Sequence, residues 1–201
     1  WDISDFFNIK NQEGMLSGNT FVYSLSTPFL REFIVFNTPD SLGITYKGQV
    51  KNQNLHAMLQ SDLIIVTHPN FLSAANDLAS YRKGQGMSVN VASTQDIYNE
   101  FSGGATDIVA IRDFVRMFYE RATNQSEMPK YLLLFGDGSY DNKNRINANS
   151  NFIPTHQSAN SHSPTDSYVS DDYFGMLDVT EGEWKTTDND IADVGIGRLP
   201  S

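Results

Sequence analysis

The sequence contains no cysteine. This absence excludes a disulfide, a zinc–thiolate site and a thiol nucleophile supplied by the chain itself. Two other catalytic motifs are missing, because neither Gly-x-Ser-x-Gly nor Gly-x-x-x-x-Gly-Lys-Ser/Thr occurs. The first would mark the nucleophile of a serine hydrolase, and the second would mark a phosphate-binding loop. The chain therefore carries none of these common catalytic centres.

Basic residues and long apolar runs are also scarce. The chain has 14 Lys and Arg against 24 Asp and Glu, a formal net charge of −10, which argues against a nucleic-acid partner. No apolar run approaches the roughly 18 residues of a membrane span, and no signal peptide is recognisable. Because the chain starts at Trp1 and ends at Ser201 directly after a strand-like run, we expect it to be a piece of a longer protein.

What the sequence does contain is enough apolar material for a core. Hydrophobic residues make up 39% of the 201 residues and aromatic residues 12%. A chain of this length and composition can form one good-sized domain with a smaller appendage.

Residues 1–60 are predicted to be a small antiparallel β segment, the end of an upstream β region. Phe21, Tyr23 and Leu25 alternate with polar residues, which is typical of a half-buried strand. The polar stretch Lys51–Ala57 resembles a linker. The strand candidates are Asn19–Ser26, Leu30–Phe36 and Ile44–Val50.

Residues 61–201 are predicted to form an α/β subdomain, with a parallel sheet flanked by helices. Short apolar runs alternate with stretches of helical periodicity, and this order requires crossover connections between parallel strands. The run Tyr131–Phe135 leads into Gly136-Asp137-Gly138 and on to Asp141, where a parallel sheet binds its ligands. Predicted strands are Leu63–Val66, Met87–Ala92, Tyr131–Phe135 and Val194–Leu199; predicted helices cover Phe71–Ala79, a turn or two after Thr94, and Ile108–Ala122.

Five aspartates follow the Tyr131–Phe135 strand and allow three interpretations. Asp137 and Asp141 are candidate calcium ligands, because clustered carboxylates on turns suit that cation. Asp137 with Asp171 or Asp172 could form a carboxylate pair for acid–base hydrolysis. All could instead cap turns by accepting bonds from nearby amides. The five are Asp137, Asp141, Asp166, Asp171 and Asp172.

The four histidines form no recognisable metal-binding pattern. His156 and His162 stand six apart in a polar loop, which is not the spacing of a helical pair of ligands. His68 follows a predicted strand, where it could reach a substrate or help to order the helix that begins near Asn70. We expect surface or structural roles for all four histidines, which are His56, His68, His156 and His162.

Six stretches, in order, resemble the gingipain family of cysteine peptidases (peptidase family C25), and most nearly its PorU-type sortases of the type IX secretion system. The resemblance covers essentially the whole chain. The stretches are Asp62–Phe71, Ile97–Phe101, Tyr131–Asn142, Phe152–Thr155, Ser167–Gly175 and Gly195–Pro200.

The resemblance implies a caspase-like fold of two side-by-side subdomains, of which this chain holds the first. In that family the catalytic His, within Gly-His-Gly, and the catalytic Cys belong to the second subdomain. Neither motif occurs here, so no catalytic residue can be carried over and the chain alone is expected to be inactive. The implied partners are the second, catalytic subdomain and secreted proteins with C-terminal sorting domains. The implied location is the outer face of the outer membrane, or secretion.

Two further hypotheses stay open at this stage. The segment could belong to a surface-binding or adhesion protein that uses the same scaffold without catalysis. It could also belong to a metal-assisted hydrolase built on the aspartates, which would require two or more carboxylates to converge on one ion.

Overall fold

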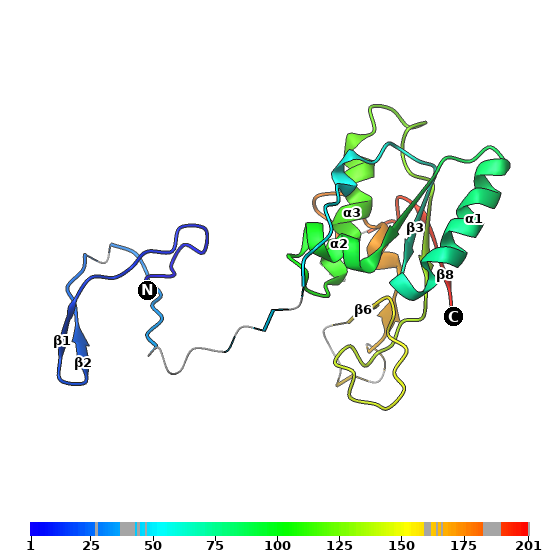
Figure 1. Cartoon of the computed structure of the whole chain (residues 1–201). Coiled ribbons are helices and arrows are strands. Elements are labelled where there is room, and N and C mark those ends of the chain that lie inside the picture. The colour runs from blue at the N-terminus through cyan, green and yellow to red at the C-terminus, as the bar shows by residue number, and fades with distance from the viewer. Residues whose placement is uncertain are drawn as a thin grey trace. The chain divides into compact units, whose positions relative to one another are not determined.

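A computed structural model describes residues 1–26, 28–36, 43, 45–46, 48–158, 162–163, 165, 167–182 and 190–200. The chain forms two compact units, Trp1–Gln49 and Val50–Ser201 (Figure 1). Asp166 lies outside the described residues, as do Ile44 and Lys47 of one predicted strand. The division into an upstream β region, 1–60, and a first peptidase subdomain, 61–201, stays a prediction.

The first unit contains a two-stranded antiparallel hairpin, β1 (Met15–Ser17) with β2 (Thr20–Val22). Gly18 has φ 61° in the turn, a conformation that glycine adopts without strain. The side chains of both strands are exposed, and the predicted strand Leu30–Phe36 is reduced to a single bridge between Asp2 and Phe33. An isolated hairpin buries too little apolar surface to extend its pairing, which explains why the observed strands are shorter than predicted.

The second unit is built on a parallel sheet of four strands in the order β4-β3-β5-β8. The strands are β3 (Leu63–Thr67), β4 (Val89–Ser93), β5 (Tyr131–Phe135) and β8 (Gly195–Leu199). All five residues of β3 are buried, as expected for a parallel strand covered on both faces. The predicted α/β class is therefore observed.

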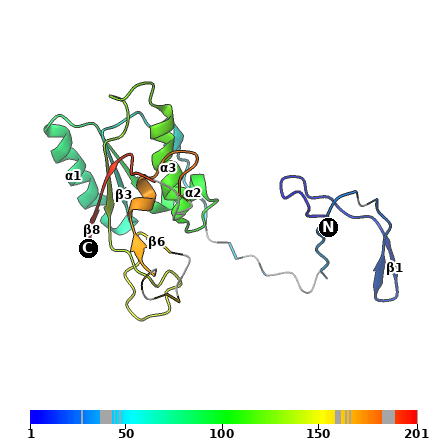
Figure 2. The same cartoon turned by 180° about the vertical axis from the view of Figure 1, so that it is seen from behind.

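Helices cover the two faces of the sheet, α1 (Leu72–Gly84) on one and α2 (Thr94–Phe101) with α3 (Ile108–Arg121) on the other (Figures 1 and 2). Alternate residues of each strand point to opposite faces. Ile65 accordingly packs with Ala75 and Ala79 of α1, whereas Ile64 packs with Phe114 and Phe118 of α3. The sheet thus separates two apolar layers.

Short elements complete the unit around the sheet. They are the 3-10 turns η2 (Leu55–Ala57), η3 (Pro69–Phe71) and η4 (Asp172–Gly175), and the antiparallel pair β6 (His156–Gln157) with β7 (Val169–Ser170). None of the helices in the described ranges has the length and apolar character that crossing a membrane requires.

Part of the stretch interpreted as a linker, Lys51–Ala57, is bound to α2. One carboxylate oxygen of Glu100 accepts hydrogen bonds from the Leu55 amide at 2.7 Å and from Gln53 Nε2 at 3.0 Å. The second oxygen contacts His56 Nδ1 at 2.8 Å. Partial burial alone would raise the pKa of Glu100, but these bonds hold it below its usual value. The linker interpretation is wrong for residues 53–57, because Gln53, the Leu55 amide and His56 all contact one carboxylate, which local periodicity does not reveal.

Asp62 joins the amino-terminal ends of three strands. Its carboxylate accepts bonds from Lys130 Nζ at 2.6 Å, ahead of β5, and from Ser88 Oγ at 2.6 Å, ahead of β4. The Lys130 bond, followed by the Ser88 bonds, holds the pKa of Asp62 well below its ordinary value of 3.8. Ionised Asp62 therefore stabilises the register of the sheet at neutral pH.

We expect Asp62→Asn to lower the free energy of unfolding by about 1 kcal/mol at pH 7, since charged hydrogen bonds are weakened. The folded-state pKa is depressed, so this stabilisation is fully present above the ordinary pKa and is lost as the pH falls below about 4. Urea unfolding between pH 7 and pH 2.5 checks it, with Asp77→Asn on the exposed face of α1 as the control. A gap between wild type and Asp62→Asn that does not narrow in acid would contradict the assignment.

Candidate functional site

The carboxyl-terminal edge of the sheet carries the residues that the sequence singled out. In open parallel sheets, ligands bind beyond this edge. β5 ends in Gly136-Asp137-Gly138, the predicted turn, and the segment 152–155 crosses over it. The Ile153 amide donates to the Asp137 carbonyl at 2.9 Å, and the Gly136 amide donates to the Leu199 carbonyl at 2.9 Å. The turn therefore connects β5, β8 and the crossing segment.

Both glycines of the turn are required by its geometry. Gly136 has φ 149°, and a Cβ on Gly138 would lie 2.5 Å from Thr155 Cγ2 and 2.9 Å from the Ile153 carbonyl. Backbone approaches this close leave no room for a side chain. The Gly-Asp-Gly pattern is thus explained by packing, and it makes no phosphate loop.

Arg198 on β8 organises this edge, and sequence reasoning missed it. Its Nε and Nη2 donate to the two carboxylate oxygens of Asp171 at 2.7 and 2.6 Å. Its Nη1 donates to the carbonyls of Gly136 and Ile153, both at 2.9 Å. The planar guanidinium suits this fork geometry. The available signal was an arginine inside an otherwise apolar strand.

Arg112 has a similar role on α3, and sequence reasoning missed it too. It is buried, and its guanidinium donates to the carbonyls of Met176, Asp178 and Glu181 at 2.5, 3.1 and 3.0 Å. A Cβ on Gly182 would lie 3.0 Å from its Cζ. A basic residue between the apolar positions of a helix face was the available signal. Arg112 fixes the segment that follows η4.

An aromatic cluster adjoins the turn. The rings of His68 and Phe71 each lie 4.9 Å from that of Phe152, and Phe71 also lies 6.4 Å from Phe135. His68 Nδ1 accepts the Asn70 amide at 3.2 Å, which is the helix-ordering role considered for it. Burial lowers the pKa of His68, which favours the neutral ring. The cluster gives the edge an apolar wall.

The aspartates have different partners from one another. Asp141 is buried, and its Oδ2 accepts hydrogen bonds from the amides of Arg145 and Ile146, the second at 2.7 Å. These bonds match the turn-capping interpretation of Asp141. Asp171 binds Arg198, and Asp172 begins η4. Within the described ranges, no group of three or more His, Asp and Glu side chains could hold a metal ion. Calcium at Asp137 and Asp141 stays a prediction, as does a catalytic carboxylate pair.

The remaining histidines occupy separate places. His56 stacks on Phe101 at 4.7 Å, and His156 stacks on Tyr173 at 4.7 Å. Burial lowers the pKa of His156. These contacts agree with the structural roles expected for both. The edge as a whole combines the aromatic cluster with the Asp171–Arg198 pair, and the sequence has no thiol to act as a nucleophile.

Comparison with known proteins identifies the family. The family model for peptidase family C25 matches residues 56–201. The crystal structure of dimeric latent PorU from Porphyromonas gingivalis is similar, with a TM-score of 0.66 and 36% identity, covering 77% of this chain and 15% of that chain. No curated protein matches.

Two gingipain structures are more distant. The Arg-specific cysteine proteinase gingipain R (RGPB) gives a TM-score of 0.46 at 19% identity, covering 75% of this chain and 27% of that chain. The complex of Porphyromonas gingivalis RgpB pro- and mature domains gives a TM-score of 0.45 at 21% identity, covering 69% of this chain and 25% of that chain. The resemblance expected from the six stretches and the α/β fold class expected with it are confirmed by the family match and the PorU structure. This chain belongs to peptidase family C25.

Proposed function

We propose that this chain is the first, non-catalytic α/β subdomain of a longer cysteine endopeptidase. The observation that carries the proposal is the family match over residues 56–201 in a chain without cysteine. A cysteine peptidase requires a thiolate, a base and oxyanion donors within hydrogen-bond reach. The thiolate must come from outside this chain, and residues 61–201 then serve as the scaffold beside it.

The carboxyl-terminal edge of the sheet is the part of this chain that would border the substrate cleft. Arg198 and the turn at Gly136 hold three segments in one place, so this border is rigid. Catalytic groups need supports that keep their geometry within a fraction of an ångström. The contribution of this chain is accordingly positional, through the turn, the aromatic cluster and the Asp171–Arg198 pair.

We also propose the finer activity, a sortase at the cell surface that processes secreted proteins carrying C-terminal sorting domains. The 36% identity to PorU supports this over a general peptidase. The thiol would form an acyl-enzyme with the substrate carbonyl and release the sorting domain. Transfer of the new carboxyl end to an acceptor nucleophile other than water would regenerate the thiol.

Peptide hydrolysis tests the proposal. Residues 1–201 alone should cleave no peptide substrate, whereas the longer protein should cleave one and should lose that activity after iodoacetamide treatment. The matched control is the longer protein with its nucleophilic Cys replaced by Ala. Thiol-sensitive cleavage by residues 1–201 would contradict the proposal, and an inactive longer protein lacking Gly-His-Gly and Cys would favour the adhesion module instead.

A further inference from the structure

β8 differs from its neighbours in having no buried residue. Its five residues alternate between exposed and half-buried, whereas all five residues of β3 are buried. It is also the end strand of the order β4-β3-β5-β8. Parallel strands are normally covered on both faces, because the crossover helices pack there. β8 therefore lacks part of the cover that its type of sheet requires.

The uncovered part lies on the α1 face. Gly195 and Gly197 pair with Tyr131 and Leu133 of β5, so these residues share that face. Tyr131 is 52% exposed, although it belongs to a strand that is central in the sheet. α1 packs its apolar residues over β3 and β4, with Ala75 and Ala79 against Leu63, Ile65 and Val89. Within the described ranges, no helix covers β5 and β8 on this face as α1 covers β3 and β4.

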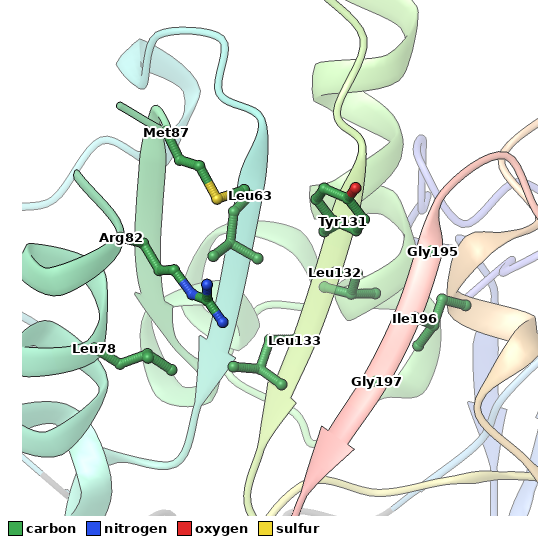
Figure 3. A pocket seen from close by; sticks show the side chains of 10 residues that line it. All are labelled: Leu63, Leu78, Arg82, Met87, Tyr131, Leu132, Leu133, Gly195, Ile196 and Gly197. Atoms are coloured by element: carbon green, nitrogen blue, oxygen red, sulfur yellow. The ribbon is translucent and has the colours of Figure 1, made fainter. Parts of the chain in front are cut away.

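A groove of about 590 Å³ occupies this position, and we call it the sheet groove (Figure 3). Leu78 and Arg82 of α1 line one side, Leu133 of β5 lines the floor, and Gly195 and Gly197 of β8 line the other side. A Cβ on Gly197 would meet nothing within 4 Å, so the backbone of β8 is bare at this point. The groove is apolar and belongs entirely to the second unit.

Arg82 is the charged group of the groove. Its side chain extends from α1 over the strands (Figure 3), and its Nη1 donates to Gln85 Oε1 at 3.2 Å. None of the ion pairs among the described residues involves it. An arginine at the rim of an apolar surface favours an occupant that carries a carboxylate.

The dimensions of the surface favour a helix as the occupant. Neighbouring strands lie about 4.8 Å apart, so β5 and β8 together present a strip about 10 Å wide. One α-helix with its side chains is about 10 Å across. Strands with bare glycines also allow a helix to approach the sheet closely. One helix lying along β5 and β8, beside α1, would complete the cover of this face.

We propose that the sheet groove is the seat of an amphipathic helix from the second subdomain of the longer protein. The helix lays its apolar face over Leu133 and Gly197 and brings an acidic side chain to Arg82. This inference rests on the proposed function, in which the catalytic half belongs to the same polypeptide. The PorU chain, of which this chain covers 15%, is long enough to supply such a segment. The groove is thus the surface through which the catalytic half docks.

Hydroxyl-radical footprinting of the longer protein tests the seat. Tyr131 in the groove and Tyr81 on α1 outside it are 52% and 61% exposed here, so they form a matched pair. In the longer protein, Tyr131 should be labelled about tenfold more slowly than Tyr81, because a packed interface excludes solvent. Equal labelling of the two tyrosines would overturn the proposal.

Two pairs of variants test the contacts. Gly197→Phe fills the groove, and Gly84→Phe adds the same ring at another glycine with open space around it. Arg82→Glu reverses the charge in the groove, and Lys83→Glu reverses the charge of the next residue on α1. The groove variants should raise the labelling rate of Tyr131 about fivefold or more above its rate in the unsubstituted longer protein, since a blocked or repelled helix exposes the surface. Tyr81 is no reference for Arg82→Glu, because the Arg82 guanidinium lies 5.9 Å from the centre of the Tyr81 ring. If Tyr131 stays as protected in both groove variants as in Gly84→Phe and Lys83→Glu, the proposal is wrong. If Gly197→Phe fails to fold, the result for Arg82→Glu alone decides.

Two controls separate the alternatives. Protection of Tyr131 that disappears on dilution, together with loss of a dimer by light scattering, would assign the groove to a second copy and overturn the proposal. Thiol-sensitive peptidase activity is measured on the same material. If the longer protein has thiol-sensitive activity but Tyr131 is unprotected, only the proposed helix seat in the sheet groove is overturned. If it has no thiol-sensitive activity, the proposed function is overturned, whatever the footprint shows.

Discussion

Replacing Arg198 by methionine should destabilise the second unit by about 3 kcal/mol, because removing one partner of a shielded, hydrogen-bonded ion pair leaves the other uncompensated. The side chains of Arg198 and Asp171 are 16% and 25% exposed. The substitution also removes the donors to the Gly136 and Ile153 carbonyls. Urea unfolding followed by circular dichroism measures the change.

Three further variants define what Arg198 contributes. Arg198→Lys should recover less than half of the loss, since an ammonium cannot reproduce the fork geometry. A double-mutant cycle with Asp171→Asn should give a coupling of at least about 1 kcal/mol. Arg116→Met is the control, because its partner Glu120 is 52% exposed and such surface pairs contribute about 0.5 kcal/mol. Equal effects of Arg198→Met and Arg116→Met would contradict the role of Arg198.

The consequence for function follows from the same contacts. Arg198 joins residues that are 27, 45 and 62 positions away in sequence. Without it, the turn after β5 and the segment at Ile153 lose their common support. In the longer protein we therefore expect Arg198→Met to reduce peptidase activity at temperatures where the fold persists, since small displacements of supporting groups lower rates strongly.

Phe114→Ala should destabilise the second unit by about 4 kcal/mol. Phe114 is fully buried on α3, and its ring makes edge contacts with Phe101 at 5.8 Å and Phe118 at 5.3 Å. Truncation removes apolar contact and leaves a cavity between α3 and the sheet. This loss approaches the whole stability of a marginal domain.

Thermal and urea unfolding of the variant check this expectation. Val109→Ala on the same helix is the control, because Val109 is 42% exposed and its truncation should cost less than about 1 kcal/mol. Phe114→Leu should fall between the two, since most of the volume is kept. A loss below about 1.5 kcal/mol for Phe114→Ala would mean that the surrounding residues collapse into the space.

Much of the fold could be predicted from local pattern. Short continuous apolar runs placed β3 and β5, and helical spacing placed α1 and α3, because each element must bury its apolar side chains. The turn after β5 was predicted from Gly136 and Gly138, and close packing at that point explains both. Strand lengths in the first unit were overestimated, since an alternating pattern does not show whether a partner strand is available.

The candidate site could be predicted only in part. Its position beyond β5 followed from the parallel sheet. Its central residue did not, because Arg198 acts through Asp171, Gly136 and Ile153, which come from separate segments. Asp141, interpreted as a possible calcium ligand, accepts two backbone amides within its own loop.

By itself, the sequence determined that this protein is an acidic α/β chain with the motifs of family C25 and without a cysteine of its own, since composition, periodicity and motif order are properties of the chain read locally. Tertiary structure alone decided the strand order, the convergence of distant carbonyls on Arg198 and the exposure of β8. These depend on contacts between residues far apart in sequence, whose energies depend on three-dimensional packing and leave no periodic trace in the chain.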